Sequence, residues 1–377
     1  MTDEEIRKHH EGYLLEHPEN NAQYTGLNVN AGVAQPPSVN PYLHRFKRKP
    51  MPTAAEMVDG ILKGDVTMLS RAVTLVESIN PNHEPIAQEV IEKCLPYSGN
   101  SKRIGITGVP GAGKSTSIDV FGLHVLKDGG KLAVLAIDPS SERTKGSILG
   151  DKTRMEKLAV HPNAFIRPSP SAGSLGGVAR KTRETIVLCE AAGYNNIFVE
   201  TVGVGQSETA VHSMVDFFLL IQLAGTGDEL QGIKRGIMEM ADGIVINKAD
   251  GDNIDRARLA QAQFKSALRL FPPTASGWTP EVLTYSGYYE LGIPEVWDMI
   301  DRYFEFVKEN GYFEQKRQEQ ARYWMYETID SRLRSNFYNN PDVEAMLADL
   351  EKQVLANKLS SFVAAGNVLD FYYKKNK

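Results

Sequence analysis

Between Arg103 and Arg302, short apolar runs alternate with amphipathic segments, and this alternation constrains the fold more than any other feature. Continuous apolarity indicates strands that are buried on both faces, and such strands form a mostly parallel sheet that helices cover. The runs are RIGITG, LAVLAID, NIFVET, FFLLIQLA, GIVINKAD and EVLTYS. The sequence therefore predicts an α/β fold with a mostly parallel central sheet.

Polar and helical segments flank this α/β region. Residues 1–52 contain the prolines and asparagines of NAGVAQPPSVNPYLHRFKRKP, which predict an extended polar arm. Residues 53–100 carry apolar side chains at helical spacing and predict three short helices. Beyond Pro294 the strand-like runs stop, and long helices broken at Asn339–Asp342 could cap the domain or form a dimer. The expected parts are an arm, a helical segment, an α/β domain and a C-terminal helical segment, at 1–52, 53–100, 101–305 and 306–377.

Composition disfavours several classes of function. The 377 residues carry a formal net charge of -5 without long charged blocks, which argues against a nucleic-acid partner. Cys94 and Cys189 lie far apart and are expected to be buried free thiols in a reducing compartment. The N-terminus lacks a signal-peptide core, and Asp3, Glu4 and Glu5 disfavour a matrix-targeting peptide. Since no window reaches the roughly 18 apolar residues of a membrane span, a cytoplasmic protein without a membrane partner is expected.

A glycine-rich loop follows the first apolar run. In GVPGAGKST, Gly108, Gly113, Lys114 and Ser115 match the pattern G-x-x-x-x-G-K-[ST] in the strand, loop and helix context that it requires. Glycines allow backbone N–H groups to face a phosphate, and the helix N-terminus adds positive potential. Lys114 is expected to reach the outer phosphates and Ser115 to bind Mg²⁺. The segment therefore predicts a nucleotide site rather than a chance glycine turn.

Two of the apolar runs carry a carboxylate at the sheet edge where this loop is expected. Asp138 ends LAVLAID, and Glu200 lies near the end of NIFVET. Parallel sheets bind ligands at the carboxyl ends of their strands, and Mg²⁺ prefers carboxylate, water and phosphate oxygens. Glu200 is therefore predicted to lie in the metal shell or to orient water, the alternative being an ion pair with a surface lysine. Gly203 would offer its N–H to the terminal phosphate, as the glycine of the D-x-x-G loop does in GTPases.

A third motif predicts the base of the nucleotide. In INKAD, Asn247, Lys248 and Asp250 follow another apolar run, and the Asp250 carboxylate can accept from both N1–H and the 2-amino group of guanine. Adenine offers neither donor in that geometry. Because the motif follows the phosphate loop in order and at a strand end, GTP and GDP are the expected nucleotides. YSGYYELGI supplies the loop expected beside the base through Ser286 and Gly287, where GTPases have alanine at the second position.

Together these segments resemble the MeaB- and MMAA-type P-loop GTPases of the SIMIBI class, which chaperone adenosylcobalamin-dependent methylmalonyl-CoA mutase. The resemblance covers about Ala54 to Arg302. It is carried, in this order, by GVPGAGKST, AIDPSSERTKGSILGDKTRM, RPSPSAGSLGGVARKTRE, VETVGVGQSE and GDELQGIKRGIMEMADGIVINKAD. The polar arm before Met51, the stretch AGTGDELQ and Gly287 depart locally from the family pattern.

The resemblance implies roles for residues in several places. Those implied to bind the phosphates and Mg²⁺ are Gly108, Gly111, Ala112, Gly113, Lys114, Ser115 and Thr116. Asp138, Asp151 and Glu200 would surround the metal ion and the hydrolytic water. The family's mobile third switch maps to Gly225–Lys234, and Lys234 would swing toward the nucleotide or Asp151. The C-terminal helices would form a homodimer, and the partner would be an adenosylcobalamin-dependent acyl-CoA mutase.

The residues themselves account for hydrolysis only in part. Positioning and electrostatic stabilisation would transfer the terminal phosphoryl group to water without a covalent intermediate. Gln206 and Arg180 are candidates to complete the site, with a solvated or structural role as the alternative for each. The lack of a strong catalyst predicts slow intrinsic turnover that a partner stimulates.

Two other functions compete with a GTPase that assists a mutase. A nickel or cobalt metallochaperone GTPase would need a Cys/His cluster, whereas the 2 cysteines and 8 scattered histidines offer none in the sequence. A small-molecule kinase would need an acceptor pocket and a base near the terminal phosphate. The Asn247–Asp250 motif also disfavours a transport-system ATPase or an arginine kinase.

Overall fold

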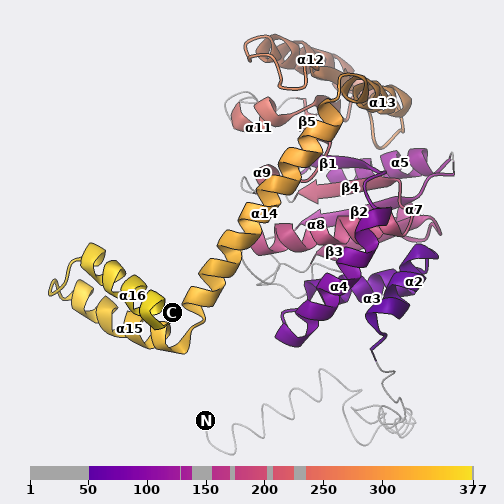
Figure 1. Cartoon of the computed structure of the whole chain (residues 1–377). Coiled ribbons are helices and arrows are strands. Elements are labelled where there is room, and N and C mark those ends of the chain that lie inside the picture. Colours follow the sequence, from indigo (N-terminus) through magenta and orange to yellow (C-terminus); the bar gives the residue numbers. More distant parts are fainter. Residues whose placement is uncertain are drawn as a thin grey trace, which may run out of the picture. The chain divides into compact units, whose positions relative to one another are not determined.

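The computed structural model describes residues 51–127, 129–137, 155–169, 175–201, 207–224 and 235–375. By its internal contacts the chain divides into two units, Met1–Met51 and Pro52–Lys377. The second unit contains the sheet and the helices drawn in colour in Figure 1. No described helix combines the length and the apolarity needed to span a bilayer.

A 7-stranded parallel sheet lies at the centre of this unit. Its order is β3-β2-β4-β1-β5-β6-β7, and all neighbouring pairs run parallel. The strands are β1 (Lys102–Gly108), β2 (Leu132–Ile137), β3 (Ala164–Ser169), β4 (Asn196–Thr201), β5 (Phe217–Leu223), β6 (Gly243–Asn247) and β7 (Glu281–Thr284). Each predicted apolar run contains one strand, so the predicted α/β fold with a parallel central sheet is confirmed.

The strand β3 is the one that the apolar pattern does not predict. Its sequence, AFIRPS, includes Arg167 and Pro168, and a proline removes a donor from the hydrogen-bond ladder. The strand lies at the end of the sheet order, beside β2. An edge strand tolerates proline because one side of its backbone forms no ladder. Position in the sheet, rather than local apolarity, therefore makes this segment a strand.

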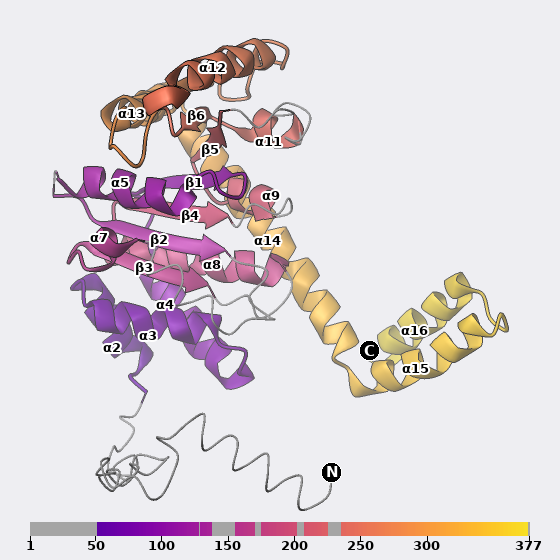
Figure 2. The same ribbon diagram turned by 180° about the vertical axis from the view of Figure 1, so that it is seen from behind.

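Helices cover both faces of the sheet (Figure 2). Alternate residues of β5 mark the two faces, since Phe218 and Leu220 pack on one side and Leu219 and Ile221 on the other. The helices on the first face are α8 (Leu175–Ala191), α9 (Ser207–His212), α11 (Arg235–Met240) and α12 (Ile254–Leu268). Those on the second face are α5 (Lys114–Lys127), α7 (Glu156–Ala159) and α13 (Ile293–Glu309).

Three short helices precede β1, as their apolar spacing predicts. They are α2 (Ala54–Leu62), α3 (Val66–Glu77) and α4 (Glu84–Cys94). Thr53 and Glu56 form a capping box at the start of α2, which satisfies two N–H groups that the helix leaves unpaired. Met57, Leu69 and Val90 are buried in the same core cluster as the inner face of α8. The three helices thus extend the core on the α8 side of the sheet.

Three helices follow α13: α14 (Tyr312–Tyr338), α15 (Pro341–Leu355) and α16 (Ser361–Lys375). The break between α14 and α15 occurs where the sequence predicts it. The Asn340 side chain accepts from Asp342 N at 3.0 Å and Val343 N at 3.4 Å, and Pro341 occupies the first helical position. Trp324, in the first half of α14, belongs to the core cluster of α8 and α9, whereas α15 and α16 share a separate apolar cluster.

Candidate nucleotide-binding site

The phosphate loop occupies the turn between β1 and α5. At Gly108, a Cβ atom would come within 2.3 Å of the Ile221 carbonyl oxygen of β5. Gly113 has a φ of +86°, and a Cβ atom there would lie 2.7 Å from Asn247 Nδ2. Both positions therefore require glycine, because the loop packs directly against the ends of β5 and β6. The helix α5 begins at Lys114, so its unpaired N–H groups lie at the loop.

Lys114 is the basic residue of this loop, and two carboxylates act on it. Its Nζ donates to Gly108 O at 3.0 Å, which folds the side chain back over the loop. Burial lowers the pKa of Lys114, whereas Glu200 and Glu208 act in the opposite direction. A phosphate bound at the loop would provide a stronger partner for the ammonium group than the carbonyl oxygen does.

Glu200 lies at the carboxyl end of β4, between two neighbouring strands. It is in register with Ile106 of β1 and Ala136 of β2, and its side chain is buried. Because Ile106 lies two residues before Gly108, Glu200 and the phosphate loop share one end of the sheet. This position is where a parallel sheet binds ligands.

The structure describes only some of the other residues that are predicted to bind metal or phosphate. Ser115 is half-buried and Thr116 exposed, both in the first turn of α5. The Ser115 hydroxyl and the Glu200 carboxylate are hard oxygen donors, which fits Mg²⁺. Asp138, Asp151, Gly203, Gln206 and the predicted switch at 225–234 lie outside the described residues. Within the described ranges, no three His, Cys, Asp or Glu side chains gather as a metal site.

Asn247 links the phosphate loop to the segments predicted to bind the base. Its Nδ2 donates to Ala112 O at 2.7 Å, in the phosphate loop. Its Oδ1 accepts from Gly287 N at 3.0 Å and from Lys248 N at 2.7 Å. Because the amide is buried, these bonds hold the two loops at a fixed separation. Asn247 thus acts as a scaffold of the site.

Asp250 and Ser286 meet at the predicted base position. Ser286 Oγ donates to Asp250 Oδ2 at 2.5 Å, which orients the carboxylate. The loop that carries Ser286 is closed by two backbone bonds with Leu291, at 2.9 and 3.1 Å. Asp250 and the backbone N–H of Gly287 therefore belong to loops that contact each other.

A hydroxyl pair beneath these loops was not anticipated from the sequence. Ser117 Oγ lies 2.5 Å from Tyr285 OH, and it donates to Gly113 O at 2.8 Å. Tyr285 is buried and directly precedes Ser286. The contact therefore ties the first turn of α5 to the loop that carries Ser286 and Gly287, here called the base loop. Ser117 directly follows GVPGAGKST and Tyr285 begins YSGYYELGI, but neither motif assigns a role to these hydroxyl groups.

Glu208 is an acidic residue to which the sequence motifs assign no role. It is the second residue of α9, and its side chain is 3% exposed. Its carboxylate acts electrostatically on Lys114. Its burial follows from the packing of α9, and no motif in the sequence signals it. Arg180, by contrast, lies on α8 and interacts with Lys181 and Glu184 of its own helix.

Comparisons with known proteins agree with this arrangement. A family model described as "Methylmalonyl Co-A mutase-associated GTPase MeaB" matches residues 69–342. A probable GTPase of Mycobacterium tuberculosis is 50% identical over 319 residues, which cover 84% of this chain and 95% of that protein. The GTPase ArgK of Escherichia coli is 45% identical over 308 residues, covering 82% and 93% of the two chains.

A mammalian relative and a solved structure extend the likeness. The mitochondrial methylmalonic aciduria type A homolog of Mus musculus is 43% identical over 327 residues, covering 84% of this chain and 79% of that protein. A crystal structure described as a LAO/AO transport system kinase matches with a TM-score of 0.68 and 37% identity, covering 87% of this chain and 100% of the other. The chain therefore belongs to the MeaB family of methylmalonyl-CoA mutase-associated GTPases.

Proposed function

We propose that this protein binds GTP together with Mg²⁺ and hydrolyses it to GDP and phosphate. The observation that carries the proposal is the Asn247 side chain, which bonds to the phosphate loop at Ala112 and to the base loop at Gly287. Beside it, the Asp250 carboxylate is oriented by Ser286. A loop that cradles phosphates and an oriented carboxylate for guanine N1–H and the 2-amino group together support a guanine nucleotide.

The described residues support distinct roles in phosphoryl transfer. The loop N–H groups and Lys114 bind the phosphates and stabilise the charge that develops during transfer. Ser115 and Glu200 would hold Mg²⁺, which supplies further positive charge at the phosphate oxygens when it is bound. Glu200, near the carboxyl end of β4, is also proposed to orient the attacking water. Asp138, Asp151 and Gly203 are proposed for the same metal, water and phosphate contacts.

The proposed partner is an adenosylcobalamin-dependent acyl-CoA mutase, with methylmalonyl-CoA mutase as the first candidate. Membership of a family described as mutase-associated supports this choice. In that role, GTP hydrolysis would be slow alone and faster with the partner, and it would assist cofactor loading and protection of the mutase.

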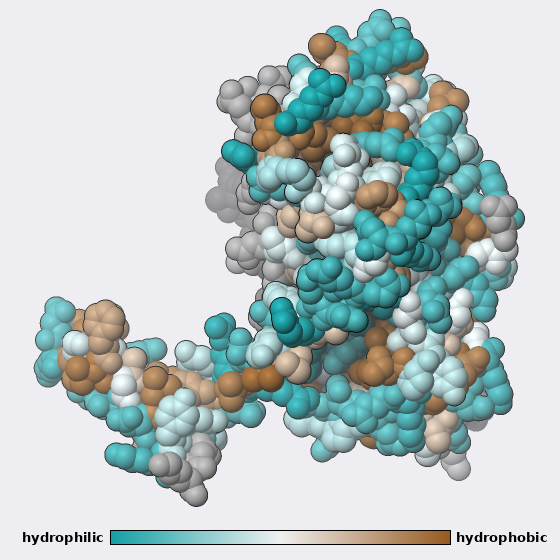
Figure 3. Space-filling view, turned by 45° about the horizontal axis from the view of Figure 1, so that its top comes forward, coloured by the Kyte–Doolittle hydropathy of each residue, from teal (hydrophilic) through white to brown (hydrophobic). Residues whose placement is uncertain are grey.

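A homodimer through the C-terminal helices is part of the proposal. Large apolar side chains are exposed on α14 and α16, including Tyr326, Leu333 and Phe362, the last with 89% of its surface accessible. Figure 3 shows brown apolar surface along these helices. Exposed apolar side chains gathered in one region favour an interface between protein surfaces. A second copy of the chain would cover them.

The test is GTP hydrolysis with and without purified candidate mutases. Phosphate release from GTP in water, with no acceptor present, is expected in the wild type and is expected to rise when the right mutase is added. Lys114→Ala serves as the inactive control, because it removes the charge at the phosphate loop. Phosphate transfer to a small molecule would favour the kinase alternative, and nickel- or cobalt-dependent stimulation would favour the metallochaperone.

A further inference from the structure

The first half of α14 contacts residues 213–216, the turn that follows the C-terminal end of the short helix α9. Lys316, Gln320 and Trp324 recur every four residues, so they share one face of α14. Their exposed fractions are 9%, 6% and 8%. Each side chain donates to a backbone carbonyl of the turn: Lys316 Nζ to Asp216 O at 2.7 Å, Gln320 Nε2 to Val215 O at 2.8 Å and Trp324 Nε1 to Ser213 O at 3.1 Å.

The turn that these donors hold joins α9 to β5. Because α9 has only 6 residues, it is too short to be stable by itself, and its position depends on its neighbours. Carbonyl groups at and beyond a helix C-terminus have no partner within the helix. Here α14 supplies donors for them from a segment about 100 residues later in the chain.

Helix α9 also contacts β1 and β4, the strands that end at Gly108 and just beyond Glu200. Glu208, its second residue, is buried and acts on Lys114 of the phosphate loop. Helix α9 therefore carries Glu208 near its start and is followed at its other end by the turn that α14 contacts. A displacement of α14 would move the turn, and the turn would carry Glu208 with it.

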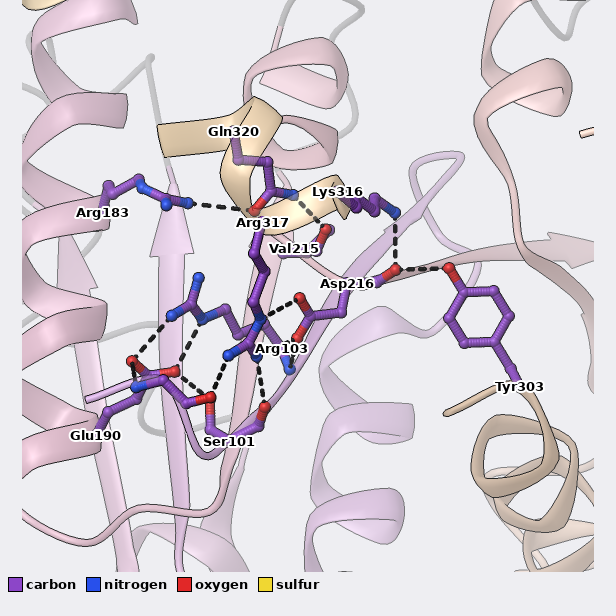
Figure 4. A network of polar contacts seen from close by, with 11 residues as sticks. Ser101, Arg103, Arg183, Glu190, Val215, Asp216, Tyr303, Lys316, Arg317 and Gln320 are labelled. Atoms are coloured by element: carbon purple, nitrogen blue, oxygen red, sulfur yellow. Dashed lines mark hydrogen bonds and ion pairs between the residues drawn. The ribbon is translucent and has the colours of Figure 1, made fainter. Parts of the chain in front are cut away.

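The side chain of Asp216 makes this attachment rigid (Figure 4). Arg317 of α14 donates to it from Nε at 2.9 Å and from Nη2 at 2.7 Å. The Arg103 backbone N–H of β1 also donates to it, at 3.0 Å. Burial alone would raise the pKa of Asp216, but Arg317 and Arg103 overcome that effect and lower it. The carboxylate is therefore charged and bonded to both β1 and α14.

We propose that Lys316, Gln320 and Trp324 are positioning residues for GTP hydrolysis, acting through α9 on Glu208 and Lys114. The inference rests on the proposed hydrolysis but concerns residues far from the phosphate loop in sequence. It follows that α14 couples the nucleotide site to the C-terminal helices. Since such coupling is reciprocal for binding, nucleotide changes the ordering of α14, and a molecule held on α14 changes nucleotide affinity.

The first experiment separates turnover from binding. Gln320→Met and Trp324→Phe together remove two donors while keeping most of the apolar volume. Single-turnover GTP hydrolysis is expected to slow about tenfold, and GDP affinity by calorimetry is expected to fall by a smaller factor, about threefold, because positioning affects rate more than ground-state binding. Arg332→Ala is the matched control, since it removes an exposed ion pair between α14 and Glu84 of α4. Wild-type hydrolysis in the double variant would overturn the proposal.

The second experiment uses the wild type and does not need hydrolysis. Backbone hydrogen exchange is measured in residues 207–216 and 312–326, with and without GDP. Both segments are expected to become more protected together, while α3 stays unchanged. In the double variant, only 207–216 should respond. If GDP does not change the hydrogen exchange of residues 312–326 in the wild type, the coupling is refuted, even if GTP is hydrolysed. If GDP protects both segments but GTP is never hydrolysed, the coupling stands and the proposed reaction fails.

Discussion

Burial lowers the pKa of Lys114, whereas two carboxylates from different elements, Glu200 on β4 and Glu208 on α9, act to raise it. The carboxylates counteract burial and help keep the ammonium group charged before any phosphate arrives. The phosphate-loop motif predicts the role of Lys114, and the position of Glu200 near a strand end predicts its role. Glu208 could not be predicted in this role, since its approach to Lys114 depends on how α9 packs against the sheet.

Asp250→Asn is expected to switch nucleotide preference from GTP toward XTP. The carboxylate accepts from the guanine 2-amino group, whereas the amide can donate to the 2-keto oxygen of xanthine. Competition binding with both nucleotides measures the change, which is expected to reach about tenfold or more for loss of a charged hydrogen bond. Asp252→Asn, at an exposed position nearby, is the control and should keep the preference for GTP. Unchanged selectivity in Asp250→Asn would mean that this side chain does not read the base.

Because His212 lies buried at the end of α9, we expect the folded protein to lose stability in mild acid. Burial and the neighbouring Lys316 lower the pKa of His212 from 6.5 to about 4. Between those values the unfolded chain binds a proton that the folded chain does not, so the free energy of unfolding falls as the pH drops from 6.5 toward 4. The loss from this group is at most about 3 kcal/mol.

The measurement is urea unfolding across this pH range in the wild type and in His212→Gln. Other buried acids also titrate below neutral pH, so the informative quantity is the difference between the two proteins. The variant is expected to lose less stability on acidification. Parallel curves would show that His212 is not the titrating group.

Individual elements are joined by buried charges rather than by apolar packing alone. Arg103 of β1 and Glu190 of α8 form a paired contact, Nε to Oε1 at 2.8 Å and Nη2 to Oε2 at 2.9 Å. Ser101 Oγ and Gly99 N also donate to Glu190. Burial by itself would raise the pKa of Glu190, but Arg103 and these donors lower it. Charge pairing thus fixes how α8 sits against β1.

Glu190→Ala is expected to destabilise the fold by about 3–5 kcal/mol, because it leaves the Arg103 guanidinium buried without its main partner. Glu89→Ala, which removes an exposed pair with Lys93 on α4, should change stability by less than about 1 kcal/mol. Urea unfolding at pH 7 compares the two variants. Equal effects would indicate that the Arg103 pair behaves like a surface contact.

Loops at one end of the sheet form the site, and α14 contacts the turn that follows α9. The proposed third switch at 225–234, outside the described residues, follows β5, the strand that the α9 turn leads into. A partner that contacts the switch or the C-terminal helices would therefore act on the same nucleotide site by different routes.

Replacing Asp228, Glu229 and Lys234 together with Ala is expected to abolish mutase stimulation of hydrolysis. GTP binding should stay within about threefold of the wild type, because it relies on Lys114 and Asp250. Paired titrations of intrinsic and mutase-stimulated rates test this. Full stimulation in the triple variant would exclude a switch at this loop.

Sequence alone determined the α/β class, most strands, the break before α15 and three motifs of the site. Those features are local, since continuous apolarity, glycine spacing and helix caps are encoded within a few neighbouring residues. Tertiary structure decided that AFIRPS becomes an edge strand, that Asn247 joins the two loops and that Glu208 is buried at the start of α9. It also decided that α14 holds the α9 turn. These contacts join segments that are far apart in the chain, and their geometry arises only when the sheet order and helix packing bring them together.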